Sequence, residues 1–492
     1  MTNWRGVSAF SAGSPHRRST ISMTSKPTEA AGSENATTTD HVEPGPMGIA
    51  SLPPELLAII FKMALSTRRV QYKLPFEVVL SHVSSLWRAV AITTPTLWTR
   101  IDIYSSRLDC AANYLQRSGS HILLDIRVDI YNADKRILIR SVHKRKNLIQ
   151  SIVKTLFPYI HRARSLLVLS CFELTALTLL SPLYDSVAPN LQRLRMNIGH
   201  PATTSPRTAG FEAFSKGLPQ LTFLETDLPN CVPLSLQNLT TLHLHTLTDT
   251  LDLSYQSFIA MITTPPSLCN LSIKGSLDIS HWPWHLNGPG FSMKNLKALR
   301  LPDKSMFSAK ILLAISAPNL QSLWLGSSFN HYGRLFDAPQ MSGPAGKFPV
   351  LKYLTIPSYD FSYNTQFPNA FPTVTHLHLP NANLHYRFDT RFTSTFTSHW
   401  RHLDTLVTGM VRQAQVLKFH DALSKFLPHR RNAGFPIRQL LIDDDLRNML
   451  NKDPNVLQYV KVDVLSLETY REPWWIMSQE RHMDHPSSML SY

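Results

Sequence analysis

Cysteine is scarce in this chain of 492 residues, and long apolar runs are absent. The four cysteines, Cys110, Cys171, Cys231 and Cys269, are far apart and form no C-x-x-C pair. This spacing indicates reduced thiols and not a disulfide framework. No run of 18 apolar residues occurs, and the N-terminus lacks the apolar core of a secretory signal. We therefore expect no membrane span and a cytoplasmic and/or nuclear location.

Motifs that would indicate catalysis are also missing. The sequence has no G-x-G-x-x-G, no Walker loop, no H-E-x-x-H and no G-x-S-x-G. Two H-x-H pairs, His243/His245 and His376/His378, each place two imidazoles on one strand face, a geometry that can bind zinc. The sequence supplies no third ligand at a fixed spacing, so we interpret both pairs as exposed strand positions. We expect no metal, no cofactor and no enzymatic activity.

The formal net charge of +15 raises the question of a nucleic-acid partner. Residues 106–170 hold twelve Lys and Arg against four acids, a net charge of +8. Lys144, Arg145 and Lys146 lie there on a predicted amphipathic helix, 135–157. The sequence favours a solvated helix face, and a patch for an acidic partner or nucleic acid is the alternative.

A helical segment with two apolar stripes is predicted near the N-terminus. Leu52-Pro53-Pro54-Glu55 is typical of a helix start, because proline suits the first turn and an acid suits its positive end. The first stripe, at helical spacing, consists of Leu56, Leu57, Ile60 and Phe61. A second predicted helix ends before Pro95 and carries Val79, Val83, Leu86, Trp87 and Val90. So much apolar surface on short helices indicates a covering partner.

The order Leu-Pro-x-Glu-Leu-Leu, Ile-Phe, Val-Ser, Trp-Arg and Pro-x-Leu-Trp over residues 50–100 resembles an F-box. The F-box is the helical module that docks on the Skp-type adaptor of cullin–RING ubiquitin ligases. The resemblance implies an adaptor-binding surface made of Leu52, Pro53, Leu56, Leu57, Ile60 and Phe61, with Leu86 and Trp87 in support.

From residue 191 onward a Leu-x-x-Leu-x-Leu pattern recurs, with a mean period of about 27 residues, as in leucine-rich repeats. Its starts are Leu191, Leu221, Leu239, Leu268, Leu296, Leu320, Leu351, Val374, Leu403, Ile437 and Val462, with a degenerate copy at 165–169. The spacing is irregular, and the usual Asn or Cys after the third apolar residue is missing. Stacked units predict a solenoid whose concave face carries polar strand residues. Among these, Arg300, Trp324, Tyr353, His376 and His378 should lie side by side and bind a target.

The sequence therefore predicts an α/β protein with a small helical F-box followed by an irregular leucine-rich-repeat solenoid. The solenoid would have parallel strands on its concave face and helices and loops outside. The expected parts are a disordered tail 1–46, an F-box 47–105, a linking strand and basic helix 106–170, and a solenoid 171–492. The leading hypothesis is a non-catalytic substrate receptor of a Skp–cullin–F-box ubiquitin ligase, with an unknown target protein. A scaffold unrelated to ubiquitin, or a binder of acidic surfaces or nucleic acid, is the alternative.

Overall fold

The computed structural model describes seventeen stretches of the chain. They are residues 49, 52–66, 75–104, 108–131, 142–200, 214–227, 236–247, 254–275, 290–301, 305–326, 347–356, 367–380, 400–408, 413–442, 447–448, 450 and 454–464. The predicted tail 1–46 lies outside them. The contacts divide the chain into Met1–Leu52 and Pro53–Tyr492, and the second unit contains every helix and strand named below.

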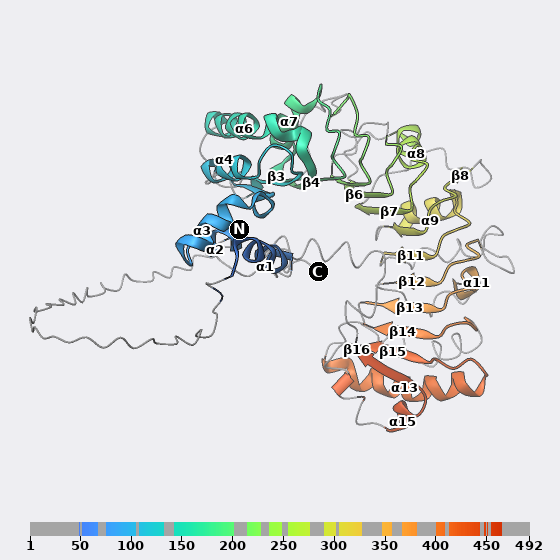
Figure 1. Cartoon of the computed structure of the whole chain (residues 1–492). Helices are drawn as coiled ribbons and strands as arrows, with labels where there is room; N and C mark the ends of the chain where they lie inside the picture. The colour runs from blue at the N-terminus through green and yellow to red at the C-terminus, as the bar shows by residue number, and fades with distance from the viewer. Residues whose placement is uncertain are drawn as a thin grey trace, which may run out of the picture. The chain divides into compact units, whose positions relative to one another are not determined.

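The fold is α/β, built on one open sheet of 14 parallel strands that follow one another in chain order (Figure 1). These strands are β1 (Arg100–Tyr104), β2 (Leu124–Asp129), β3 (Ala163–Phe172), β4 (Arg193–His200), β5 (Phe223–Thr226), β6 (Thr241–Leu247), β7 (Asn270–Gly275), β9 (Ala298–Leu301), β11 (Ser322–Leu325), β12 (Tyr353–Thr355), β13 (His376–Leu379), β14 (Thr405–Thr408), β15 (Gln439–Ile442) and β16 (Lys461–Val464). A small second sheet pairs β8 (Phe291–Ser292) with β10 (Ile315–Ser316). The large sheet begins at Arg100, well before the residue from which the sequence predicts the solenoid.

Helices connect many of the strands. The α-helices are α1 (Pro54–Ser66), α2 (Phe76–Leu80), α3 (Ser85–Thr93), α4 (Leu108–Arg117), α6 (Val142–Leu156), α7 (Glu173–Leu180), α8 (Tyr255–Thr263), α9 (Ser305–Ala314), α11 (Phe367–Ala370), α13 (Gln413–Asn432) and α15 (Pro454–Leu457). Three 3₁₀ helices are η2 (Pro95–Trp98), η3 (Phe157–Arg162) and η4 (Ser181–Leu183). Among the described helices, none combines the length and the apolar character needed to cross a bilayer.

One apolar residue per strand forms a continuous ladder across the sheet. In register, this inner row consists of Ile101, Ile126, Leu166, Leu194, Leu224, Leu242, Leu271, Leu299, Leu323, Leu354, Leu377, Leu406, Leu440 and Val462. Connecting helices pack against this face, since Ile152 of α6, Phe258 of α8 and Phe419 of α13 belong to the same core cluster. Each strand alone could not bury its inner side chain, so the stack is what forms the core.

The strand positions agree with ten of the eleven predicted repeat starts. For the ten starts from Leu191 to Ile437, the strand begins two residues after the first apolar position. The eleventh start, Val462, is wrong by three residues, because Val462 pairs with Leu440 in the inner row. The first position of that unit is Tyr459, an aromatic residue that does not fit a leucine pattern.

Asparagine side chains tie successive repeats together at a position that the sequence analysis missed. Asn190, Asn238, Asn295 and Asn319 each precede the first leucine of a repeat. Their side-chain amides donate to backbone carbonyls of the preceding unit, over 2.9, 2.7, 2.8 and 2.8 Å respectively. The Asn-Leu pair, preceded by Pro, Gln or Lys, is therefore a structural signal of these repeats.

Candidate protein-docking surfaces

Helix α1 has two apolar faces, and among the described residues only one of them is packed against the rest of the chain. Leu57 and Phe61 are buried, and the ring of Phe61 lies 5.0 Å from that of Trp87 on α3. On the opposite face, four apolar side chains are 38–65% exposed: Leu56, Ile59, Ile60 and Met63. Their spacing of three and four residues places them along one side of the helix. A helix that is apolar all round and packed on one side leaves a surface suited to a partner.

The second predicted helix is in fact two helices, because the chain turns at Ser81–Ser84. The Ser81 hydroxyl donates to the carbonyl of Val78 over 2.7 Å, which closes α2. Ser84 is extended (φ −155°), and its hydroxyl accepts from the backbone N–H of Trp87 over 3.1 Å, which begins α3. Serine favours such caps over helix interiors, so these serines should have predicted the break.

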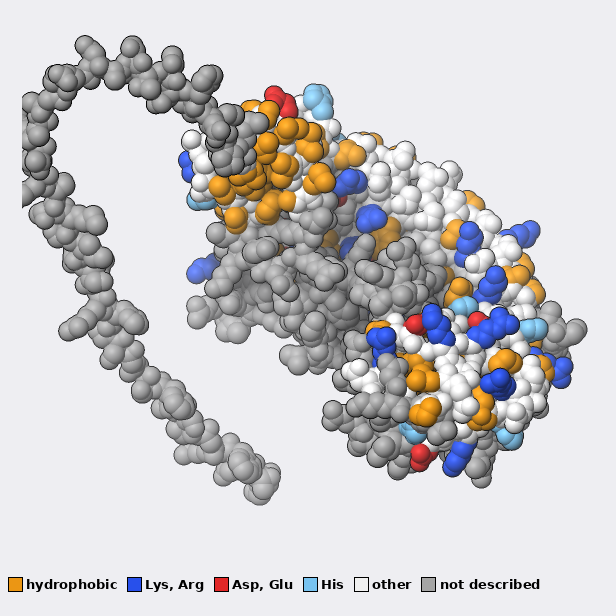
Figure 2. All heavy atoms as spheres, turned by 60° about the horizontal axis from the view of Figure 1, so that its bottom comes forward, with side chains coloured by type: hydrophobic (Ala, Val, Ile, Leu, Met, Phe, Trp, Pro, Cys, Tyr) orange, Lys and Arg blue, Asp and Glu red, His pale blue; other side chains and the backbone are white. Residues whose placement is uncertain are grey.

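We call Leu56, Ile59, Ile60, Met63, Val79 and Val83 the docking patch, since all six apolar side chains are exposed on this helical segment (Figure 2). Pro53 is also exposed, and Leu52, Leu86 and Trp87 are partly buried. Leu57 and Phe61 belong to the predicted adaptor-binding set, but both side chains are buried inside this protein and do not form part of the exposed surface. The spacing of α1 could not show which of its apolar faces points inward. Ile59 and Met63 were missed for that reason.

Polar contacts join the helical segment to helix α4 and hold its own helices together. Glu77 of α2 is buried, and its carboxylate accepts a 2.6 Å hydrogen bond from the Tyr114 hydroxyl of α4. Burial, and then this carboxylate, raise the pKa of Tyr114. The buried Trp98 of η2 donates from Nε1 to the carbonyl of Ala91 over 2.8 Å. The docking patch thus stands on a supported helical platform.

The predicted target-binding residues lie in two rows on the face of the large sheet that is opposite the inner row. Arg300 and Trp324 are in register on β9 and β11, with the guanidinium carbon 3.4 Å from the indole centroid. Tyr353 pairs with His376 in the neighbouring row, with ring centroids 4.5 Å apart. His378 lies two residues beyond His376 and is buried. The structure therefore brings together two pairs, and not one continuous line of five.

Several positions on this face are less exposed than predicted. His243, His245 and His378 are buried, so their interpretation as exposed strand residues is wrong. On β14 and β15 this face is only partly polar: Thr405 and Gln439 lie on it, but Val407 and Leu441 are buried there as a separate apolar pair. The alternation of inward apolar and outward polar residues fails in these last strands, and the sequence already contained that signal.

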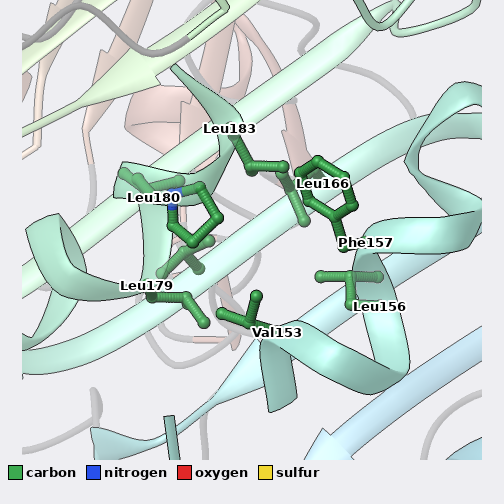
Figure 3. Close-up of a pocket in the computed structure, with 9 residues that line it drawn as sticks. Val153, Leu156, Phe157, Leu166, Leu179, Leu180 and Leu183 are labelled. Carbon is green, nitrogen blue, oxygen red and sulfur yellow. The ribbon is translucent and has the colours of Figure 1, made fainter. Parts of the chain in front are cut away.

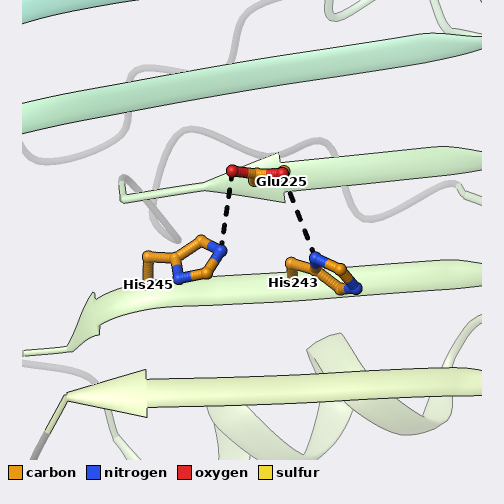
Figure 4. Close-up of side chains that lie close together, drawn as sticks. All are labelled: Glu225, His243 and His245. Carbon is orange, nitrogen blue, oxygen red and sulfur yellow. Dashed lines mark ion pairs between the residues drawn. The ribbon is translucent and has the colours of Figure 1, made fainter. Parts of the chain in front are cut away.

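One cluster on this face could hold a metal ion (Figure 4). Glu225 of β5 lies between two imidazoles of β6, with Oε1 3.6 Å from Nε2 of His245 and Oε2 4.0 Å from Nδ1 of His243. Arg195 of β4 reaches the same carboxylate, with Nε 3.5 Å from Oε2. The third ligand candidate that the sequence analysis did not find is therefore Glu225, which is supplied by the neighbouring strand.

The basic triplet is only partly at the surface. Lys144 and Lys146 of α6 are exposed, whereas Arg145 is half-buried with its guanidinium carbon 6.0 Å from the ring centroid of Phe172. Residues 135–141 of the predicted helix 135–157 lie outside the described residues. In the described part, the predicted apolar stripe is confirmed at Ile149 and Ile152, which belong to the core. Arg145 thus packs beside Phe172, and the fully exposed positive charges of this triplet are those of Lys144 and Lys146.

An apolar hollow lies between α6 and α7 (Figure 3). Its wall consists of Val153, Leu156, Phe157, Leu166, Val168, Leu179, Leu180, Pro182 and Leu183. No acid, base or nucleophile lines it, so it offers none of the converging polar groups that fix a substrate. We interpret it as a gap in helix packing.

A scan against models of known protein families finds no match, and a search of curated protein sequences finds none either.

Proposed function

We propose that this protein is a substrate receptor of a Skp–cullin–F-box type ubiquitin ligase. In this proposal the segment of α1, α2 and α3 is an F-box that docks on the Skp-type adaptor, and the parallel sheet is an irregular leucine-rich-repeat solenoid that holds a target protein. The observation that carries the proposal is the second apolar face of α1, which is exposed in a segment whose sequence order resembles an F-box.

The energetics of the docking patch are suited to a protein interface. Full burial of a Leu, Ile or Met side chain contributes about 1.5–3 kcal/mol relative to full exposure. Because Ile59 and Met63 are 50% and 65% exposed, each could contribute roughly 1–2 kcal/mol when a partner covers it. Amphipathic helices commonly bind in a groove on a partner protein, with apolar contact residues spaced by three and four positions.

The chain itself would contribute no reacting group to ubiquitin transfer. The resemblance implies that a RING partner and a ubiquitin-carrying enzyme supply the chemistry. The receptor would raise the local concentration of a target lysine near that enzyme, which is catalysis by proximity. The stacked Arg300–Trp324 pair and the Tyr353–His376 pair are the proposed target contacts, since Arg, Trp and Tyr dominate interface hot spots.

The test is co-purification of the full chain with the Skp-type adaptor. A variant with Ile59→Glu and Met63→Glu places two charges in the proposed interface. The lost apolar burial and the cost of burying each charge together exceed 3 kcal/mol, so we expect affinity to fall by roughly a hundredfold or more.

The matched control is the pair Leu174→Glu and Val187→Glu. These two side chains are 57% and 42% exposed, outside the docking patch, and should tolerate the same change without loss of binding. Both variants alter surface positions, so both should keep wild-type stability within about 0.5 kcal/mol. Undiminished adaptor binding by the Ile59/Met63 variant, or absence of binding by the wild type, would refute the docking model. If docking is established but the lifetime of a bound target protein does not depend on this chain, the result would favour the alternative of a scaffold unrelated to ubiquitin.

A further inference from the structure

We propose that Glu225, His243 and His245 form a binding site for a divalent transition-metal ion, with Zn²⁺ as the best-suited occupant. The site is separate from the docking patch and does not depend on the proposed function. The three residues come together because Glu225 and His243 are register partners on the adjacent parallel strands β5 and β6. His245 follows two residues later on the same face of β6.

The distances between the candidate ligand atoms are close to those of a metal site. Zinc binds imidazole nitrogen and carboxylate oxygen at about 2.0–2.2 Å, which in a tetrahedral arrangement separates neighbouring donors by about 3.3–3.6 Å. Oε1 of Glu225 lies 3.6 Å from Nε2 of His245, and Oε2 of the same carboxylate lies 4.0 Å from Nδ1 of His243. With one ligand atom taken from each residue, the three atoms lie within 4.8 Å of one another. Shifts of up to about 1.5 Å would complete the site.

The burial of the cluster supports the same assignment. Glu225, His243 and His245 are 1%, 3% and 6% exposed. A carboxylate so far from solvent is stable only when a cation, a metal ion or hydrogen-bond donors compensate its charge. Two imidazoles with one carboxylate is a ligand set used by zinc, copper and iron, whereas calcium and magnesium prefer oxygen ligands alone. Three protein ligands would leave a further coordination position for water.

Arg195 is the competing cation. Its Nε lies 3.5 Å from Oε2 of Glu225, longer than the ~2.7–2.9 Å of a charge-assisted hydrogen bond. Its guanidinium carbon also lies 5.2 Å from the ring centroid of Phe223. A bound ion would use Oε1, beside His245, and would share the carboxylate with this guanidinium. Because two cations repel, removing the charge of Arg195 should strengthen metal binding, whereas it would only weaken a simple ion pair.

The experiment uses the full chain after treatment with a chelator, with Zn²⁺ as the probe. Titration calorimetry should give one strongly bound equivalent, and Zn²⁺ should raise the melting temperature, since a ligand of the native state stabilises it. We expect Glu225→Gln to weaken Zn²⁺ binding at least a hundredfold, and Arg195→Gln to strengthen it severalfold.

The second H-x-H pair provides the matched control. His376 and His378 have the same spacing on β13, but their register partners on β12 are Tyr353 and Thr355, which supply no carboxylate. The double variant His376→Ala/His378→Ala should therefore keep the zinc site that His243→Ala/His245→Ala destroys. Equal loss in both double variants would overturn the proposal, as would weaker binding by Arg195→Gln.

Co²⁺ bound to the wild-type chain gives a readout that requires no substitution. A site of nitrogen and oxygen ligands with four or five donors should produce visible d–d absorption that Zn²⁺ displaces at one equivalent. The absence of this absorption, or of stoichiometric Zn²⁺ binding by the wild type, would show that the cluster is only a buried ion-pair network.

Discussion

Lys347 should make the stability of this protein rise with pH above neutrality. It is half-buried before β12, and its Nζ donates to the backbone carbonyl of Leu313 at the end of α9. Burial lowers the pKa of Lys347 from its ordinary 10.5 to about 8. The cause is loss of solvation of the ammonium group in the folded chain.

The sign follows from the protons bound by each state. Between pH 8 and 10.5 the unfolded chain keeps the Lys347 proton while the folded chain has lost it, so raising the pH favours the folded state. Below about pH 7 both states are protonated and the contribution is constant. With these two pKa values, the contribution of Lys347 to the free energy of unfolding increases by about 2 kcal/mol between pH 7 and 9.5.

The measurement is urea unfolding, followed by tryptophan fluorescence at pH 7 and pH 9.5, on the wild type and on Lys347→Met. Other titrating groups affect both proteins equally, so the difference between them isolates Lys347. The wild type should gain about 2 kcal/mol relative to the variant over this range. The control is Lys352→Met, an exposed lysine nearby that should respond to pH as the wild type does. An identical pH response of Lys347→Met and the wild type would show that Lys347 does not lose its proton earlier in the folded chain.

Two further predictions concern the core and the end of α13. Leu323→Ala removes a fully buried member of the inner row and should lower the free energy of unfolding by about 2–5 kcal/mol. The control is Ile59→Ala at the surface, which should change the free energy of unfolding by less than about 0.5 kcal/mol. Urea unfolding of both variants measures the difference. Arg430 is fully buried, and its guanidinium donates to the carbonyls of Phe435 and Trp400 over 2.8 and 3.0 Å. Arg430→Met leaves these acceptors without that donor and should cost about 2–4 kcal/mol, visible as a lower melting temperature; an unchanged value would contradict this.

The sheet could be predicted from the sequence because its signal is local. Each repeat carries its own leucines, so ten strands could be placed from single windows of six residues. Strand β1 was missed even though Arg100-Ile101-Asp102-Ile103-Tyr104 alternates clearly, because it lies directly after the helical segment and was assigned to it. The chain-order topology then follows, since parallel neighbours joined by short connections stack one by one.

The sites were harder to predict because they depend on contacts between distant segments. The metal cluster needs the register of β5 against β6, which sets Glu225 opposite His243 although 18 residues separate them. No spacing within one strand contains that information. Similarly, Leu57 and Ile59 are both apolar residues of α1, and only the packing of α3 decides that the first is buried and the second exposed.

If the protein is the proposed receptor, the burial of much of the polar face of the sheet leaves a smaller surface on which a target protein could bind. Glu225, His243 and His378 are buried and cannot contact a target as the structure stands. Arg300 and Trp324 are partly exposed and already stacked, so they would lose little side-chain freedom on binding. A receptor whose contact residues are ordered in advance binds a target at lower entropic cost than one whose side chains must be fixed. This favours the Arg300–Trp324 stack, ahead of the histidines, as the centre of a target-binding surface.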